Sequence, residues 1–186
     1  MKNIIAVVFF LVTALSCIGQ SVIPVVDKSP LDISYYPDNY PVLKIQDKVA
    51  GPILARVVYS RPQKNNRVVF GDLIEYGKVW RLGANEATEL EFFVNVKINN
   101  VKIKKGRYTL YSIPYADKWT IILNKENDTW GSFRYDVKKD IVRIDVPVQK
   151  QTVIAEYFSL LFEKANGGFA LTAAWDDVKV SLPVYL

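Results

Sequence analysis

Apolar and polar residues alternate along much of the chain after Gly51, and an alternation of two is the period of a β-strand. In 88–98 the even positions carry Thr, Leu, Phe, Val, Val and Ile, whereas the odd positions carry mainly Glu, Asn and Lys. In 178–186 the even positions are again all apolar. One apolar and one polar face per strand predicts sheets that bury only one of their sides.

The same pattern predicts a series of short strands with turn residues between them. Asn99-Asn100 is expected to form a tight hairpin turn, because Asn tolerates the positive φ that a two-residue loop needs. No helical period is convincing, and 73–79 has room for one helical turn at most. We therefore predict an all-β fold, a single antiparallel β-sandwich that is jelly-roll-like. The expected strands are 53–59, 88–98, 101–104, 108–113, 119–123, 141–148, 153–162, 169–175 and 178–186.

Before this domain, which we place at 51–186, the chain is rich in proline. Proline at this density interrupts helices and interior strands. We interpret 20–50 as an extended N-terminal arm that packs its tyrosines onto the sandwich. A linker with a peptide-binding role is the other interpretation. The prolines concerned are Pro24, Pro30, Pro37 and Pro41.

Residues 1–19 have the features of a signal peptide. A short basic start precedes an apolar run over 4–15, which is too short to span a bilayer comfortably, and small residues follow up to Gly19. We predict cleavage near Gly19 and a periplasmic or secreted protein with no transmembrane span in the mature chain. The alternative is a lipoprotein anchored at Cys17, although Ala14 stands where a lipoprotein signal usually has Leu.

Composition removes several kinds of chemistry. The chain has 186 residues and no His, and its only Cys is Cys17 in the predicted leader. His-based general bases, Ser-His-Asp triads, His-ligated metals and thiol nucleophiles are therefore excluded from the mature domain. The net charge of +5 is mild, and Lys and Arg are interleaved with Asp and Glu, so we expect no nucleic acid partner. We predict no cofactor and no metal.

The segment 79–92, VWRLGANEATELEF, is denser in chemically capable groups than any other. Trp80 offers a face for stacking, and Arg81 offers a planar fork for a carboxylate or phosphate. Together they are candidates for holding a small anionic or sugar-like ligand. The competing interpretation is that Trp80 belongs to the core and Arg81 pairs internally with Glu86 or Asp72.

Carboxylates in this region suggest a second kind of chemistry. Glu86 follows Asn85 where a loop is expected to meet a strand, and sites gather at such junctions. A raised-pKa Glu86 with Asp72 or Glu75 as partner could hydrolyse a glycan. The other interpretation is an ion pair that locks the loop, between Glu86 and Arg81 or Arg67. Glu89 and Glu91 share the face that we expect to meet solvent.

Trp130 follows Asn127-Asp128 in a turn, so among the four tryptophans it is the one that we expect at a rim. Arg67 lies in a local basic loop, for which ordinary solvation is the default interpretation. The candidate ligand-binding set is Trp80, Arg81, Asn85, Glu86, Arg67 and Trp130.

Several strings in the chain resemble a bacterial family catalogued as domain of unknown function 2911. The resemblance runs from about Ser29 to the C-terminus and departs from the usual family pattern at Leu82, where Thr is common. It implies a secreted or envelope protein and no known activity, so it supplies no catalytic residues. The strings are YSRP at 59–62, RVVFG at 67–71, YGKVWRLGANEAT at 76–88, GRYTL at 106–110, WTIILN at 119–124 and WG at 130–131.

These observations predict a non-catalytic binding or structural domain of the bacterial envelope. Its partner would be a small anionic or sugar-like ligand, or another envelope protein. The alternative is the carboxylate-dependent glycan hydrolase with Glu86 as the acid/base.

Overall fold

The structure, a computed structural model, describes residues 23–186. The predicted signal peptide and Cys17 lie outside the described residues. Within residues 23–186 there is no helix long and apolar enough to cross a membrane.

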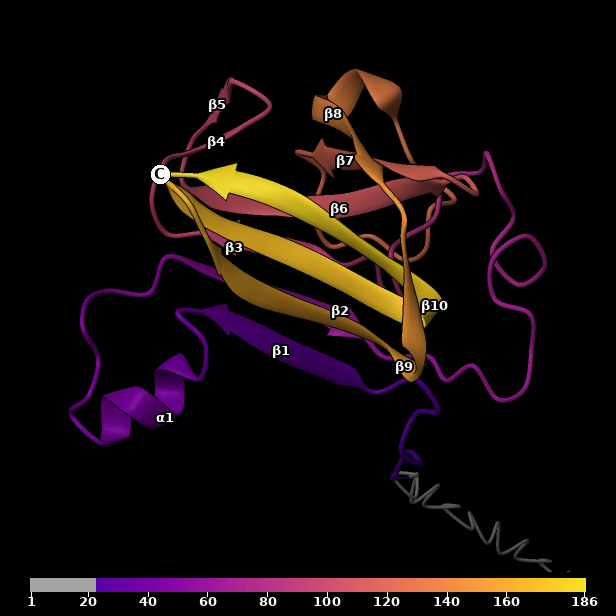
Figure 1. Ribbon diagram of the computed structural model, residues 1–186, viewed down its shortest axis with the longest axis horizontal. Coiled ribbons are helices and arrows are strands. Elements are labelled where there is room, and N and C mark those ends of the chain that lie inside the picture. Colours follow the sequence, from indigo (N-terminus) through magenta and orange to yellow (C-terminus); the bar gives the residue numbers. More distant parts are fainter. Residues whose placement is uncertain (1–22) are drawn as a thin grey trace, which may run out of the picture.

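Two antiparallel sheets face each other, which confirms the predicted all-β sandwich (Figure 1). The six-stranded sheet contains, in order, β1 (Leu31–Tyr36), β2 (Ala55–Ser60), β3 (Glu89–Phe92), β6 (Gly106–Pro114), β7 (Lys118–Asn124) and β8 (Asp140–Pro147). The four-stranded sheet contains β5 (Val101–Ile103), β4 (Val96–Ile98), β10 (Gly168–Tyr185) and β9 (Gln149–Ala165). The helices of the described chain are α1 (Tyr40–Ile45) and a single 3-10 turn, Val137–Lys139.

The strand connections are those of a meander. Consecutive strands are neighbours throughout the six-stranded sheet, except where the β4–β5 hairpin leaves to join the end of β10. β8 then runs almost directly into β9, and β9 and β10 form one long hairpin. The chain therefore passes between the two sheets at β3–β4, β5–β6 and β8–β9.

Aromatic residues fill the core between the sheets. Trp80 stacks on Trp175 at 6.0 Å between ring centroids, and it meets Trp119 edge-on at 5.7 Å and Phe158 at 5.2 Å. These four rings come from a loop, β10, β7 and β9, so a single cluster joins both sheets. Rings that meet in tilted or edge-to-face arrangements add to the free energy gained from burial alone.

A second, smaller apolar cluster covers part of the outer face of the six-stranded sheet. Tyr111 and Ile122 are cross-strand partners on that face, and both are fully buried. Ala87 lies on them from the loop before β3, and Tyr135 from the loop after β7. Two loops are therefore packed onto a face that would otherwise meet solvent.

The region that the sequence predicts as an arm is more structured than expected. Residues 31–36 form β1, an edge strand whose register runs from Leu31 opposite Ser60 to Tyr36 opposite Ala55. Pro30 and Pro37 flank the strand without interrupting it, and Pro41 stands in the first turn of α1, where its missing N–H leaves no bond unmade.

Two predicted strands also have different limits. The alternation over 88–98 is continuous, but the strand breaks at 93–95, where the chain passes from one sheet to the other. Conversely, 169–175 and 178–186 belong to one strand, β10, with a pairing irregularity around Asp176, whose φ is 55°.

Candidate ligand-binding groove

The two loops on the outer face of the six-stranded sheet bring together three of the predicted site residues. Glu86 and Trp130 form an isolated antiparallel bridge. The amide of Gly131 donates to the carbonyl of Asn85 at 2.9 Å, and the amide of Ala87 donates to the carbonyl of Thr129 at 3.0 Å. Asn85 and Glu86 are therefore held beside Trp130 by backbone hydrogen bonds.

Side chains fix the Trp130 loop to the sheet below it. The hydroxyls of Tyr111 and Thr129 lie 3.0 Å apart, and the hydroxyl of Ser132 donates to the carbonyl of Val79 at 3.0 Å. The amide of Asp128 donates to the carboxylate of Glu89 at 3.1 Å. Even so, the side chain of Trp130 is 60% exposed. The loop is anchored on both sides of a tryptophan that it leaves in solvent.

The far end of this loop is fastened by a polar network. The Tyr135 hydroxyl donates to Asp140 at 2.5 Å, Arg143 donates to the same carboxylate at 2.7 Å and also to the Tyr135 hydroxyl, and Asn124 donates to the other Asp140 oxygen at 2.8 Å. Burial and the Asp140 carboxylate together raise the pKa of Tyr135 to about 12.

A groove of about 350 Å³ lies beside Trp130. Arg107 spans two of its acidic residues, at 3.2 Å from Glu89 and 2.9 Å from Asp128. Glu86 is exposed and has no ion-pair partner among residues 23–186. The groove is lined by the apolar Leu31, Val58 and Ala87, by Thr129 and Trp130, and by the carboxylates Glu86, Glu89 and Asp128.

Trp130 also lines a second hollow, of about 630 Å³. Phe133, 85% exposed, and Arg134 line it, and Lys139 pairs with Glu126 at its edge. Trp130 is thus shared by two adjoining hollows, and two exposed aromatic rings of one loop face solvent within four residues of each other.

The chemistry of the groove suits a particular class of ligand. An apolar floor and an indole favour flat, partly apolar faces, and a few polar groups orient the ligand. The carboxylates accept hydrogen bonds from hydroxyl or ammonium groups, whereas they repel an anion. Within residues 23–186 there is no cluster of three or more acidic, His or Cys side chains that could hold a metal ion.

Trp80 and Arg81 lie elsewhere. Trp80 is buried in the core, where neighbouring rings cover it and its indole N–H donates to the carbonyl of Gly83 at 2.9 Å. Arg81 pairs with neither Glu86 nor Asp72, and within the described chain its Nε is buried without a hydrogen-bond partner. Burial lowers the pKa of Arg81.

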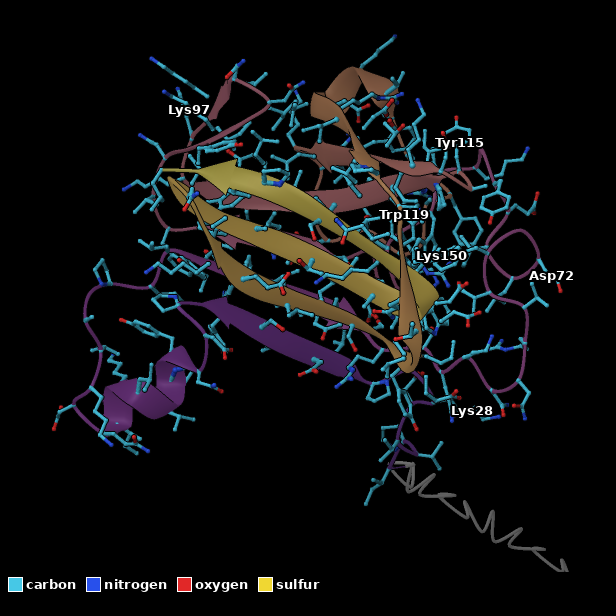
Figure 2. All side chains as sticks on the ribbon, in the orientation of Figure 1. Lys28, Asp72, Lys97, Tyr115, Trp119 and Lys150 are labelled. Carbon is cyan, nitrogen blue, oxygen red and sulfur yellow. The ribbon has the colours of Figure 1, made fainter. Side chains whose placement is uncertain are left out.

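The remaining candidates also lie apart from the groove. The Arg67 guanidinium donates to the carbonyls of Lys64, at 2.9 Å, and Gln63, so it closes its own loop. Asp72 and Glu75 are exposed and do not line the groove. Asp72 stands on a loop at the edge of the molecule (Figure 2).

The sequence alone does not identify three of the residues that line the groove. Leu31 falls in the segment predicted as an arm, and Val58 is one apolar residue of a predicted strand. Asp128 is predicted to be a turn residue. The alternation did place Glu89 on the outer face, and the register that sets Val58 opposite Glu89 brings these residues together. That register depends on long-range pairing, which local patterns do not contain.

Comparisons with known proteins give one result. Curated proteins give no match to the chain, and solved structures give none either. The model of the family described as "Protein of unknown function (DUF2911)" matches residues 41–184. This match covers most of the chain and confirms the resemblance seen in its motifs, so the chain belongs to this family.

Proposed function

We propose that this protein is an exported, non-catalytic binding domain of the cell envelope that holds a sugar-like ligand in the groove beside Trp130. The observation that carries the proposal is the state of Trp130: an indole that is 60% exposed on a loop fastened at both ends. A loop that served only to cover the sheet would gain by burying this ring. An exposed ring on a fastened loop is already presented to a ligand, so less conformational entropy is lost when one binds.

A sugar fits the groove better than an anion does. A pyranose ring presents C–H groups on its faces, which pack on an indole, and hydroxyl groups at its edge, which donate to carboxylates. Glu86 can accept such bonds because it has no cation beside it among residues 23–186. The second hollow and Phe133 extend the surface past Trp130, as an oligosaccharide would require.

Export to the periplasm or beyond rests on the leader at 1–19, with the lipid anchor at Cys17 as its alternative. A carbohydrate-binding domain placed there would meet the glycans of the envelope. If no glycan binds, the partner we expect in its place is an envelope protein.

The test is a glycan array followed by calorimetry of the hits. We expect Trp130→Ala to lose binding at least tenfold and Glu86→Gln to lose it severalfold, because one removes the stacking face and the other a charged acceptor. The control is Tyr157→Ala, which removes a 45% exposed aromatic ring from β9 in the other sheet. Binding that survives Trp130→Ala, or that falls equally in the control, contradicts the proposal.

One observation favours a glycan hydrolase as the second candidate. Glu86 shares its groove with two other carboxylates, Glu89 and Asp128, and Arg107 pairs with those two and not with Glu86. Such an asymmetric set could supply an acid and a base. Release of reducing ends from a bound oligosaccharide, abolished by Glu86→Gln while binding persists, is the result that would replace the binding role with this one.

A further inference from the structure

Besides the groove, the described surface has a strongly basic region at the other side of the sandwich, on the β4–β5 hairpin. No acidic residue occurs between Glu91 and Asp117, and the hairpin lies within this interval. Its four lysines are exposed, and none forms an ion pair within residues 23–186. They are Lys97, Lys102, Lys104 and Lys105.

The pairing of the two strands places like charges against each other. Lys97 lies directly opposite Lys102, and Lys104 follows directly after β5. Like charges at directly opposed positions disfavour strand pairing. A local feature that works against folding indicates selection for something other than stability.

Apolar groups are exposed among these lysines. Val101, next to the Asn99-Asn100 turn, is 38% exposed, and Tyr185 and Leu186, at the end of β10 on the other side of β4, are 46% and 59% exposed. Figure 1 shows the hairpin next to the C-terminal end of β10, and Tyr185 pairs with Lys97. A hollow of about 430 Å³ separates the hairpin from Leu186, with Val96 and Ile103 among its lining residues.

Edge protection does not account for this combination. Lysines on an edge strand do discourage pairing between molecules. Lys102 does lie on the edge strand β5, but Lys97 lies on β4, which is flanked by β5 and β10. Protection against association would also not leave Val101 and Leu186 exposed beside the charges.

We infer that the β4–β5 hairpin and the C-terminal end of β10 form a docking surface for an anionic lipid bilayer. Lysines beside exposed apolar side chains match a membrane interface, in which lipid headgroups supply negative charge and the acyl boundary accepts the apolar side chains. The lysine stems cover apolar surface while their ammonium groups stay with the headgroups. The inference does not depend on the groove at Trp130.

The test is cosedimentation of the purified protein with vesicles of phosphatidylcholine alone and of phosphatidylcholine mixed with phosphatidylglycerol. We expect binding to the mixed vesicles only. The triple substitution Lys97→Gln, Lys102→Gln and Lys104→Gln should weaken it about 100-fold, since each lysine near an anionic surface contributes about a factor of five. Val101→Ser should weaken it severalfold by removing apolar contact.

The matched control is Lys28→Gln with Lys48→Gln and Lys78→Gln, three exposed lysines that have no ion-pair partner in the described chain. Lys28 and Lys97 stand at opposite ends of the molecule (Figure 2). The two triple variants have the same net charge, so a difference between them reports on the hairpin. We expect the control to bind nearly as the wild type does.

Salt provides a second readout. At about 1 M salt the screening length falls to about 3 Å, so binding through the lysines should largely disappear. Three results would overturn the inference: equal binding to neutral vesicles, equal loss in both triple variants, or binding of dextran sulfate through the three lysines without any binding to vesicles. Circular dichroism spectra of all variants verify that the fold is retained.

Discussion

Trp80 and Trp130 come from neighbouring loops, yet one is buried and the other is exposed. Trp80 is 5% exposed and contacts four other aromatic rings, whereas Trp130 is 60% exposed. Both loops are anchored by hydrogen bonds, so mobility does not distinguish them. The difference is that the Trp80 indole is packed between the sheets, whereas most of Trp130 is exposed to solvent.

This contrast separates stability from recognition. The Trp80 segment joins the two sheets through its ring and closes a tight turn through its indole N–H. The Trp130 segment covers Tyr111 and Ile122 with its neighbours and leaves its own ring free. Substitutions in the two segments should therefore affect different measurements.

The largest effect is expected at Trp80. Trp80→Ala should lower the free energy of unfolding by about 3–5 kcal/mol, because it leaves a large cavity between the sheets. Trp80→Phe should cost less, because it keeps an aromatic ring in the core, although it loses the hydrogen bond to the Gly83 carbonyl. Urea denaturation followed by circular dichroism measures both. A Trp80→Ala protein as stable as the wild type would mean that Trp80 does not hold the sheets together.

A smaller effect is expected where the Trp130 loop is fastened. Tyr135→Phe removes the hydroxyl that donates to Asp140 and should cost about 1–2 kcal/mol. It should also weaken ligand binding without touching the ligand, because the loop is held less firmly. If Tyr135→Phe loses stability but binds the ligand with unchanged affinity, the Tyr135–Asp140 hydrogen bond does not position Trp130.

The same tyrosine predicts a dependence on alkaline pH. Its pKa is about 12 in the folded protein, against 10.0 for an ordinary tyrosine. The unfolded chain therefore loses the proton first, and the contribution of Tyr135 to stability is complete below pH 10 and is lost as the pH rises toward 12. Urea midpoints measured across this range should fall more steeply for the wild type than for Tyr135→Phe. Parallel curves would contradict the assignment.

At Trp130 itself the effect on stability should be small. Trp130→Ala should change the free energy of unfolding by less than about 1 kcal/mol, because most of the ring is already in solvent. Ligand binding should be lost in the same protein. A large destabilisation would show that Trp130 is a structural residue like Trp80.

The smallest effect on stability is expected at Glu86. Glu86→Gln should leave it within about 0.5 kcal/mol, because Glu86 is exposed and has no cationic partner in the described part of the chain. This outcome would exclude the interpretation that Glu86 locks the loop through an ion pair with Arg81 or Arg67. A clear drop in the melting temperature would support that interpretation.

The alternation of apolar residues was sufficient to predict the sandwich and most of its strands, because each strand buries one face only. It could not predict the break at 93–95, where the pattern continues although the chain changes sheets. Nor could it reveal β1, whose short segment between two prolines is an edge strand stabilised by pairing with β2.

The candidate site was predicted in part. Glu86, Asn85 and Trp130 do come together, although 86 and 130 are far apart in the chain, and the rim position expected for Trp130 from its turn agrees with its exposure. Composition could not distinguish Trp80, a core ring, from a stacking platform. The choice depends on which side of the sheet a loop crosses, and that is set by tertiary packing.

The most direct test of the central claim is acrylamide quenching of tryptophan fluorescence. Trp80, Trp119 and Trp175 are each 5% exposed or less, so Trp130 should account for nearly all quenching, and Trp130→Phe should remove it. Addition of a bound oligosaccharide should protect Trp130 from acrylamide in the wild type. If a saccharide binds and leaves the quenching unchanged, or if Trp130→Phe quenches as the wild type does, the exposed indole is not the binding face.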